Sequence, residues 1–137
     1  MKKLSVVASL TAALAQPVMA ADLGLLVENI TDRQGMLLWS VFDSAEAYAA
    51  DTRPIVSARS RVTGNTLRVT LHDLPTGVYA IKLYHDANGN GELDSNMLGM
   101  PVEGYGFSNN AGHRGPATFE DAGFALDRDT QITIRLR

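Results

Sequence analysis

The chain has 137 residues, of which 45% are hydrophobic, and it contains no cysteine. That length suits one domain able to bury its own core, and the missing cysteine excludes disulfides, thiol nucleophiles and zinc–thiolate sites. The net charge of −3 argues against nucleic acid or an anionic membrane as a partner, because both attract a basic surface.

The first twenty residues have the layout of a secretory signal peptide. Two lysines open the chain, residues 4–15 are uncharged and largely apolar, and Ala20 ends a small-residue cleavage motif. The apolar stretch is shorter than the roughly 20 residues that a membrane span needs. We therefore predict removal of residues 1–20, a single domain over residues 21–137, no membrane span, and a periplasmic or secreted location. Cleavage removes two lysines and no acid, which changes the net charge from −3 to −5.

Short apolar runs alternate with Gly, Pro, Asn and Asp along the rest of the chain, as is typical of strands and turns. The clearest strand is 66–71, where Leu67, Val69 and Leu71 alternate with polar residues. The predicted strands cover residues 23–30, 36–43, 55–62, 66–71, 78–85, 122–126 and 131–137. About seven strands at roughly 8–12-residue spacing predict an all-β, Ig-like or transthyretin-like sandwich.

Two segments break the strand pattern. Ser44 is a good helix cap, and the Ala- and Glu-rich residues after it predict a short helical insertion over 44–50. Residues 73–77 predict a tight turn. Residues 86–123 are rich in Gly, Asn and Pro yet hold many apolar groups, so we expect a long ordered loop that packs on the sandwich and carries the site.

Residues 86–94 match the first two-thirds of an EF-hand-type calcium loop. In such a tight coil, alternate residues point oxygens at one centre, and a glycine in the sixth position permits the sharp turn. Calcium is therefore the predicted cofactor. The predicted ligands are the side chains of Asp86, Asn88, Asn90 and Asp94 and the main-chain carbonyl of Glu92.

The loop departs from the EF-hand pattern in ways that weaken the expected binding. Position 12 is Met97 instead of a bidentate glutamate, and two leading ligands are neutral asparagines. We expect dissociation constants toward roughly 10⁻⁴–10⁻³ M. Glu103, Glu120 and Asp121 are candidates for the missing carboxylate. An Asn-Gly turn whose side chains bond their own backbone explains the same residues without a metal.

Glycines alternate with aromatic residues over 99–110. One interpretation makes this segment a ligand-binding surface lined by Glu103, Tyr105, Asn109 and Asn110. The other has Tyr105 and Phe107 pinning the long loop to the core, and the loop's length favours it.

The sequence holds no convincing catalytic set, and we predict that the protein is not an enzyme. It has no GxSxG, HxH or HExxH motif. Ser108 shares a polar loop with His113 and Asp121, but such trios arise readily by chance. A hydrolase using carboxylates such as Glu103 and Glu120 needs a fixed separation that the sequence does not specify.

Three stretches of the chain resemble a bacterial family known as domain of unknown function 2141. They are residues 85–94, residues 99–109 with the run GMPVEGYGFSN, and residues 119–122 with the closing strand near Ile132. The resemblance covers nearly the whole exported chain and implies export and a β-sandwich similar in outline to transthyretin or carboxypeptidase-regulatory modules. It implies no activity.

We rank three hypotheses for function. The first is a periplasmic binding or accessory module that holds calcium at 86–94 and contacts a protein or small-molecule partner of the cell envelope through 99–121. The second is a purely structural module, and the third is a small envelope hydrolase. We expect a monomer with no nucleic-acid partner.

Overall fold

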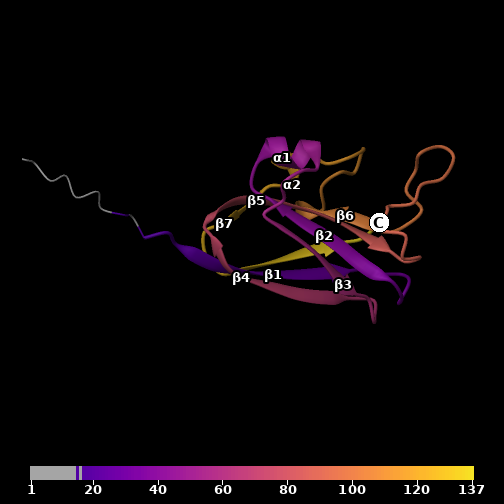
Figure 1. Cartoon of the computed structure of the whole chain (residues 1–137), viewed down its shortest axis with the longest axis horizontal. Helices are drawn as coiled ribbons and strands as arrows, with labels where there is room; N and C mark the ends of the chain where they lie inside the picture. The colour runs from indigo at the N-terminus through magenta and orange to yellow at the C-terminus, as the bar shows by residue number, and fades with distance from the viewer. Residues whose placement is uncertain (1–14, 16) are drawn as a thin grey trace, which may run out of the picture.

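The computed structural model describes residue 15 and residues 17–137 (Figure 1). Most of the predicted signal segment therefore lies outside the described residues. The described chain forms eight strands in two packed sheets, two short α-helices and one 3-10 turn. The elements are β1 (Ala20–Glu28), β2 (Met36–Phe42), α1 (Ala45–Ala50), β3 (Val56–Arg61), β4 (Leu67–Pro75), β5 (Gly77–Asp86), β6 (Tyr105–Phe107), η1 (Ser108–Asn110), α2 (Phe119–Ala122), β7 (Phe124–Leu126) and β8 (Thr130–Arg135).

One sheet has three strands in the order β4-β1-β8, in which β8 runs parallel to β1. The other has the order β3-β2-β5-β6, with antiparallel neighbours, and β7 pairs with the start of β5. The predicted all-β sandwich is confirmed.

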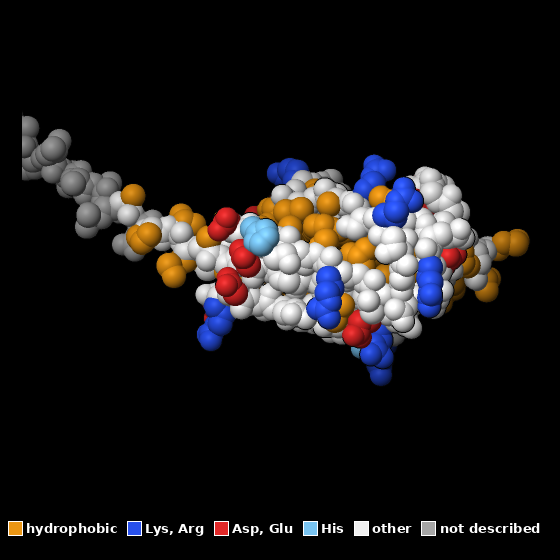
Figure 2. Space-filling model, turned by 90° about the horizontal axis from the view of Figure 1, so that it is seen from below, with side chains coloured by type: hydrophobic (Ala, Val, Ile, Leu, Met, Phe, Trp, Pro, Cys, Tyr) orange, Lys and Arg blue, Asp and Glu red, His pale blue; other side chains and the backbone are white. Residues whose placement is uncertain are grey.

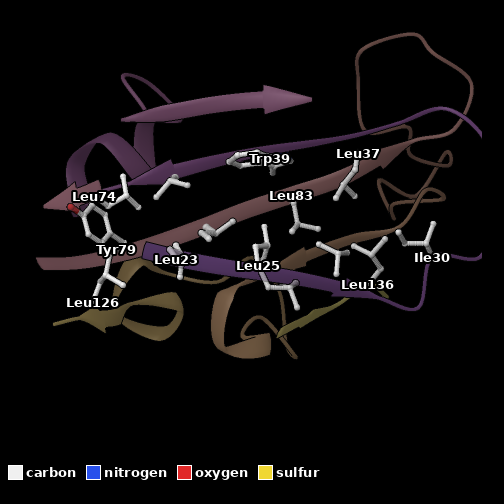
Figure 3. Packing of buried hydrophobic residues seen from close by; sticks show 14 of the residues in the cluster. Leu23, Leu25, Ile30, Leu37, Trp39, Leu74, Tyr79, Leu83, Leu126 and Leu136 are labelled. Carbon is white, nitrogen blue, oxygen red and sulfur yellow. The ribbon is translucent and has the colours of Figure 1, made fainter. Parts of the chain in front are cut away.

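Strict alternation along the strands builds the core between the sheets (Figure 3). In β1, Leu23, Leu25 and Val27 face inward and are at most 1% exposed. Ile81 and Leu83 of β5 meet them from the opposite sheet. Burial of this apolar surface, at about 25 cal/mol per Å², is the main force holding the layers together.

Both α-helices are short and begin at capping residues. The Ser44 hydroxyl accepts from Ala47 N–H at 3.2 Å, which agrees with the predicted helix start. Thr118 and Asp121 form a reciprocal capping box at α2. In the described part of the chain, no helix is long and apolar enough to cross a membrane.

Two segments differ from the sequence prediction. Strand β4 extends into the predicted turn at 73–77 as far as Pro75, because Leu74 and Pro75 pair with the start of β1 beyond a register shift, and the chain then bends at Thr76 before β5 begins. Strand β6 lies inside the predicted loop and pairs with Lys82–Tyr84 of β5. A strand of three residues carries too little alternation to be recognised in a sequence.

Candidate functional site

A groove of about 570 Å³ crosses the outer face of the larger sheet. Because side chains alternate between faces of a strand, the register sets two outward rows across β3, β2, β5 and β6. One row is Arg59, Leu38, Tyr84 and Tyr105, and the other is Ser57, Ser40, Lys82 and Phe107. Each row thus carries one basic side chain, and the aromatic side chains of both rows lie on β5 and β6, whereas the serines lie on β2 and β3.

Lys82 is held in place at the middle of the groove. Its ammonium donates to the Tyr48 carbonyl at 2.6 Å, lies 3.5 Å from an Asp51 carboxylate oxygen and sits 4.2 Å from the centroid of the Tyr48 ring. Arg59, by contrast, is exposed and takes part in no ion pair within residues 17–137. An acidic chain thus presents a guanidinium and an ammonium in one groove.

The aromatic side of the groove is braced from two directions. The rings of Tyr105 and Phe107 meet edge to face with centroids 6.1 Å apart, and the Arg137 guanidinium lies 5.7 Å from the Tyr105 centroid. The Tyr84 hydroxyl donates to the Gly91 carbonyl at 2.8 Å, which connects the groove to the loop over 86–94. Burial, followed by the negative charge of Asp86 and other acids, raises the pKa of Tyr84 above its ordinary value.

The loop over 86–94 is organised around Asp86, which is only 3% exposed. Its carboxylate accepts the main-chain N–H groups of Gly89 at 2.9 Å, Asn90 at 3.1 Å and Gly91 at 2.8 Å. Asn88 accepts in turn from Asn90 N–H at 3.1 Å. The side-chain oxygens of Asp86 and Asn88 therefore accept main-chain N–H groups of their own coil, the arrangement expected of an Asn-Gly turn whose side chains bond their own backbone.

Asp94 closes this coil. Its carboxylate accepts the side-chain N–H groups of Asn88 and Asn90, the latter at 2.6 Å. The side chains of three predicted ligands, Asn88, Asn90 and Asp94, therefore meet, whereas the Asp86 carboxylate bonds to the main chain of the coil. No three His, Cys, Asp or Glu side chains within the described residues form a metal-binding group, so an ion here depends on amide and main-chain oxygens as well as carboxylates.

Glu103 fastens the two ends of the loop. Its carboxylate accepts from Ala87 N–H at 3.1 Å and from Asp94 N–H at 3.0 Å. Of the three candidates for the missing carboxylate, Glu103 contacts the loop, whereas Glu120 and Asp121 lie on α2. Neither Asp86, Asp94 nor Glu103 forms an ion pair among the residues described, so their negative charge is not balanced by a neighbouring cation.

The side chains of Asn109 and Asn110 form hydrogen bonds with the main chain of distant segments, as does that of the neighbouring Ser108. Asn109 donates to the Gly123 carbonyl at 2.6 Å, and Asn110 accepts from Arg135 N–H at 2.8 Å. Ser108 is fully buried, accepts from Ile81 N–H and donates to the Ala122 carbonyl. Of the four predicted ligand-binding residues, only Tyr105 lines the groove.

Sequence reasoning missed Lys82, Arg59, Leu38 and Tyr84 as groove residues. The available signal was the strand over 36–43, whose apolar residues occur on both faces, a pattern that indicates a central position in a sheet. It is central, but Leu38 on its outer face is covered by no further layer and is half-buried at the groove. A sequence pattern does not distinguish a covered face from a groove floor.

A family model described as "Uncharacterized protein conserved in bacteria (DUF2141)" matches residues 25–134. The match covers the oxygen-rich loop and every groove residue. No curated protein and no solved structure gives a match, so the likeness in outline to transthyretin stays a prediction.

Proposed function

The chain belongs to the DUF2141 family of bacterial proteins, and from that premise we propose that it is an exported binding module. Its ligand site is the groove on the outer face of the larger sheet, and the loop over 86–94 is a calcium site at one end of that groove. The groove is the observation that carries the proposal, because it gathers aromatic, hydroxyl and basic side chains from four strands.

The groove chemistry favours a small ligand that carries both a ring and an acidic group. Tyr84, Tyr105 and Phe107 offer apolar surface, and Arg59, which has no ion-pair partner within residues 17–137, attracts a carboxylate. The Lys82 ammonium already lies 3.5 Å from a carboxylate oxygen of Asp51, which also lines the groove. A guanidinium binds a carboxylate through paired N–H groups, so Arg59 is the expected specificity determinant.

Calcium at the loop would draw on Asp86, Asn88, Asn90, Asp94 and the Glu92 carbonyl. The Asn88 and Asn90 amides now point N–H groups at Asp94, and binding requires them to turn their oxygens inward. The unbalanced negative charge of Asp86, Asp94 and Glu103 supports a cation at this place. The ion would stiffen the loop, whose Leu93 lines the groove.

Thermal melting tests the metal site. In about 10 mM calcium, a site with a dissociation constant near 10⁻³ M adds roughly 1.4 kcal/mol to the free energy of unfolding. We expect the midpoint to rise over that in EDTA, and Asp94→Asn to abolish the rise while the exposed control Asp127→Asn retains it. Equal midpoints in calcium and EDTA for the wild-type protein would remove calcium from the proposal.

Amide chemical shifts test the groove separately. N-acetylmuramic acid, an amino sugar with a carboxylate, and N-acetylglucosamine, the same sugar without it, form a matched pair of probes. We expect the acid to bind more tightly and to shift the amides of Leu38, Tyr84 and Tyr105. Arg59→Ala should remove the preference for the acid, whereas Arg68→Ala, on the outer face of β4, should preserve it. If neither sugar shifts these amides, the proposed site is wrong for this class of ligand.

A further inference from the structure

The segment between β5 and β6 ends in an apolar hairpin tip, which we define as residues 95–102. Four of its side chains are unusually exposed: Met97 at 104%, Leu98 at 87%, Met100 at 60% and Val102 at 63%. No residue of the tip is charged. Figure 2 shows hydrophobic side chains standing out at the end of the molecule opposite the N-terminal segment. Exposed apolar groups gathered in this way mark an interaction site.

Hydrogen bonds within the tip give its backbone a defined conformation. The Asn96 side-chain oxygen accepts from Leu98 N–H at 2.9 Å and from Met100 N–H at 3.1 Å. Gly99 N–H donates to the Asn96 carbonyl at 2.9 Å, and Asn96 N–H donates to the Met100 carbonyl at 2.8 Å. The N–H groups of Asn96, Leu98, Gly99 and Met100 are thus bonded within the tip, which lowers the cost of removing this backbone from water.

Three acidic residues, Glu92, Asp94 and Glu103, lie next to the base of the tip in the chain. Val102 N–H donates to the Asp94 carbonyl at 2.8 Å, Asp94 N–H donates to Glu103, and exposed Glu92 lies two residues before Asp94. None of the three carboxylates forms an ion pair within residues 17–137. If the tip entered a bilayer, this acidic collar would lie at the level of the lipid headgroups. It complements the ammonium of a zwitterionic lipid and repels an anionic one.

We propose that the tip inserts into the surface of a zwitterionic phospholipid bilayer, with Met97 and Leu98 in the acyl region and the collar of Glu92, Asp94 and Glu103 facing headgroup ammonium ions. The composition of the tip favours lipid over a protein partner. Its four exposed apolar side chains are aliphatic or thioether groups, whereas the energetic centres of protein interfaces are enriched in Trp, Tyr and Arg. The inference requires neither bound calcium nor a ligand in the groove, although Asp94 and Glu103 belong both to the collar and to the surroundings of the proposed calcium site.

Because the chain contains no cysteine, a single introduced cysteine can be labelled specifically. Met97→Cys in the full chain is labelled with an environment-sensitive fluorophore and mixed with phosphatidylethanolamine–phosphatidylcholine vesicles in EDTA. Because the label reports only its own surroundings, binding through residues 1–20 cannot imitate insertion of the tip. We expect a blue shift, and quenching by spin-labelled acyl chains. The same label on Arg128→Cys, in the exposed turn before β8, should show neither.

A second substitution tests the chemistry of insertion. Leu98→Asp in the Met97→Cys background should weaken insertion by roughly tenfold or more. The substitution removes an apolar side chain that insertion would bury in the bilayer and replaces it with a charge. Leu98→Met should preserve it. Vesicles of phosphatidylglycerol should give a smaller response than zwitterionic ones. The proposal is overturned if the label at position 97 ignores zwitterionic vesicles, if Leu98→Asp has no effect, or if the anionic lipid is preferred in EDTA.

Discussion

The hydroxyl oxygen of Ser108 accepts a hydrogen bond from the amide nitrogen of Ile81 at 2.9 Å, across 27 residues of sequence. The same hydroxyl donates to the carbonyl of Ala122, and Ser108 is fully buried. One side chain thus joins the central strand β5, the turn after β6 and the end of α2. This relationship fixes the long segment that carries Tyr105 and Phe107 against the sheet.

Replacement of Ser108 by alanine should destabilise the fold by about 1–3 kcal/mol. The substitution leaves the buried Ile81 N–H without a partner, and the cost of an unsatisfied buried donor has that size. Urea denaturation measures the change. Ser57→Ala, which removes an exposed hydroxyl bonded to Ser40, should stay within about 0.5 kcal/mol. Equal effects of the two substitutions would contradict the fastening role of Ser108.

Gly106 should not tolerate a side chain. A Cβ there would lie 2.7 Å from the Cγ2 atom of Ile134, which is fully buried and has little room to move. We expect Gly106→Ala to destabilise by roughly 1–3 kcal/mol through overpacking. Gly64→Ala, whose nearest neighbouring atom is 4.0 Å away, serves as the control in the same denaturation measurement.

A double-mutant cycle identifies the cause of the Gly106 effect. If the clash with Ile134 is responsible, Gly106→Ala should cost less in an Ile134→Ala background, with a coupling of about 0.5–3 kcal/mol. Additive effects would show that the strain arises elsewhere.

Tyr48 should make the fold sensitive to alkali. Within the part of the chain that the structure describes, its hydroxyl is buried without a hydrogen-bond partner, and burial, together with Asp121 and Asp51, raises the pKa of Tyr48 to about 12. An unfolded tyrosine loses its proton near pH 10, so the unfolded state binds fewer protons than the folded state above that pH. Stability is therefore unaffected below pH 10 and falls between about pH 10 and 12.

Tyr48→Phe tests both parts of this statement. At pH 7 we expect the variant to be at least as stable as the wild type, because an unpaired buried hydroxyl costs about 1–3 kcal/mol. Between pH 10 and 12 the variant should lose less stability than the wild type. Chemical denaturation at pH 7, 10 and 11 measures both, and parallel losses in the two proteins would refute the assignment to Tyr48.

Glu103→Gln should loosen the oxygen-rich loop. A glutamine keeps one acceptor oxygen, so the N–H of either Ala87 or Asp94 loses its partner. We expect a cost of roughly 1–2 kcal/mol, since hydrogen bonds to charged groups are worth about 1.5–3 kcal/mol. Amide hydrogen exchange should quicken at Ala87 or Asp94. Glu92→Gln, at an exposed site, should leave both exchange rates unchanged.

The β-sandwich could be predicted from the amino-acid sequence alone. Alternation such as that of Leu67, Val69 and Leu71 marks one face of a strand for burial, and the hydrophobic effect requires those faces to meet. The sequence likewise specified the coil at 86–94, because Asp86 bonds to N–H groups within five residues of itself. Interactions as local as these depend on spacing alone.

The composition of the groove, by contrast, could not be predicted without the tertiary structure. The groove row of Arg59, Leu38, Tyr84 and Tyr105 comes from four strands, and its assembly depends on pairing register between distant segments. The roles of Ser108, Asn109 and Asn110 also depend on the tertiary structure, because the hydrogen-bond partners of their side chains lie 12 to 27 residues away. A polar residue in a loop looks the same in sequence whether it faces a ligand or holds a carbonyl, and only the fold places its partner.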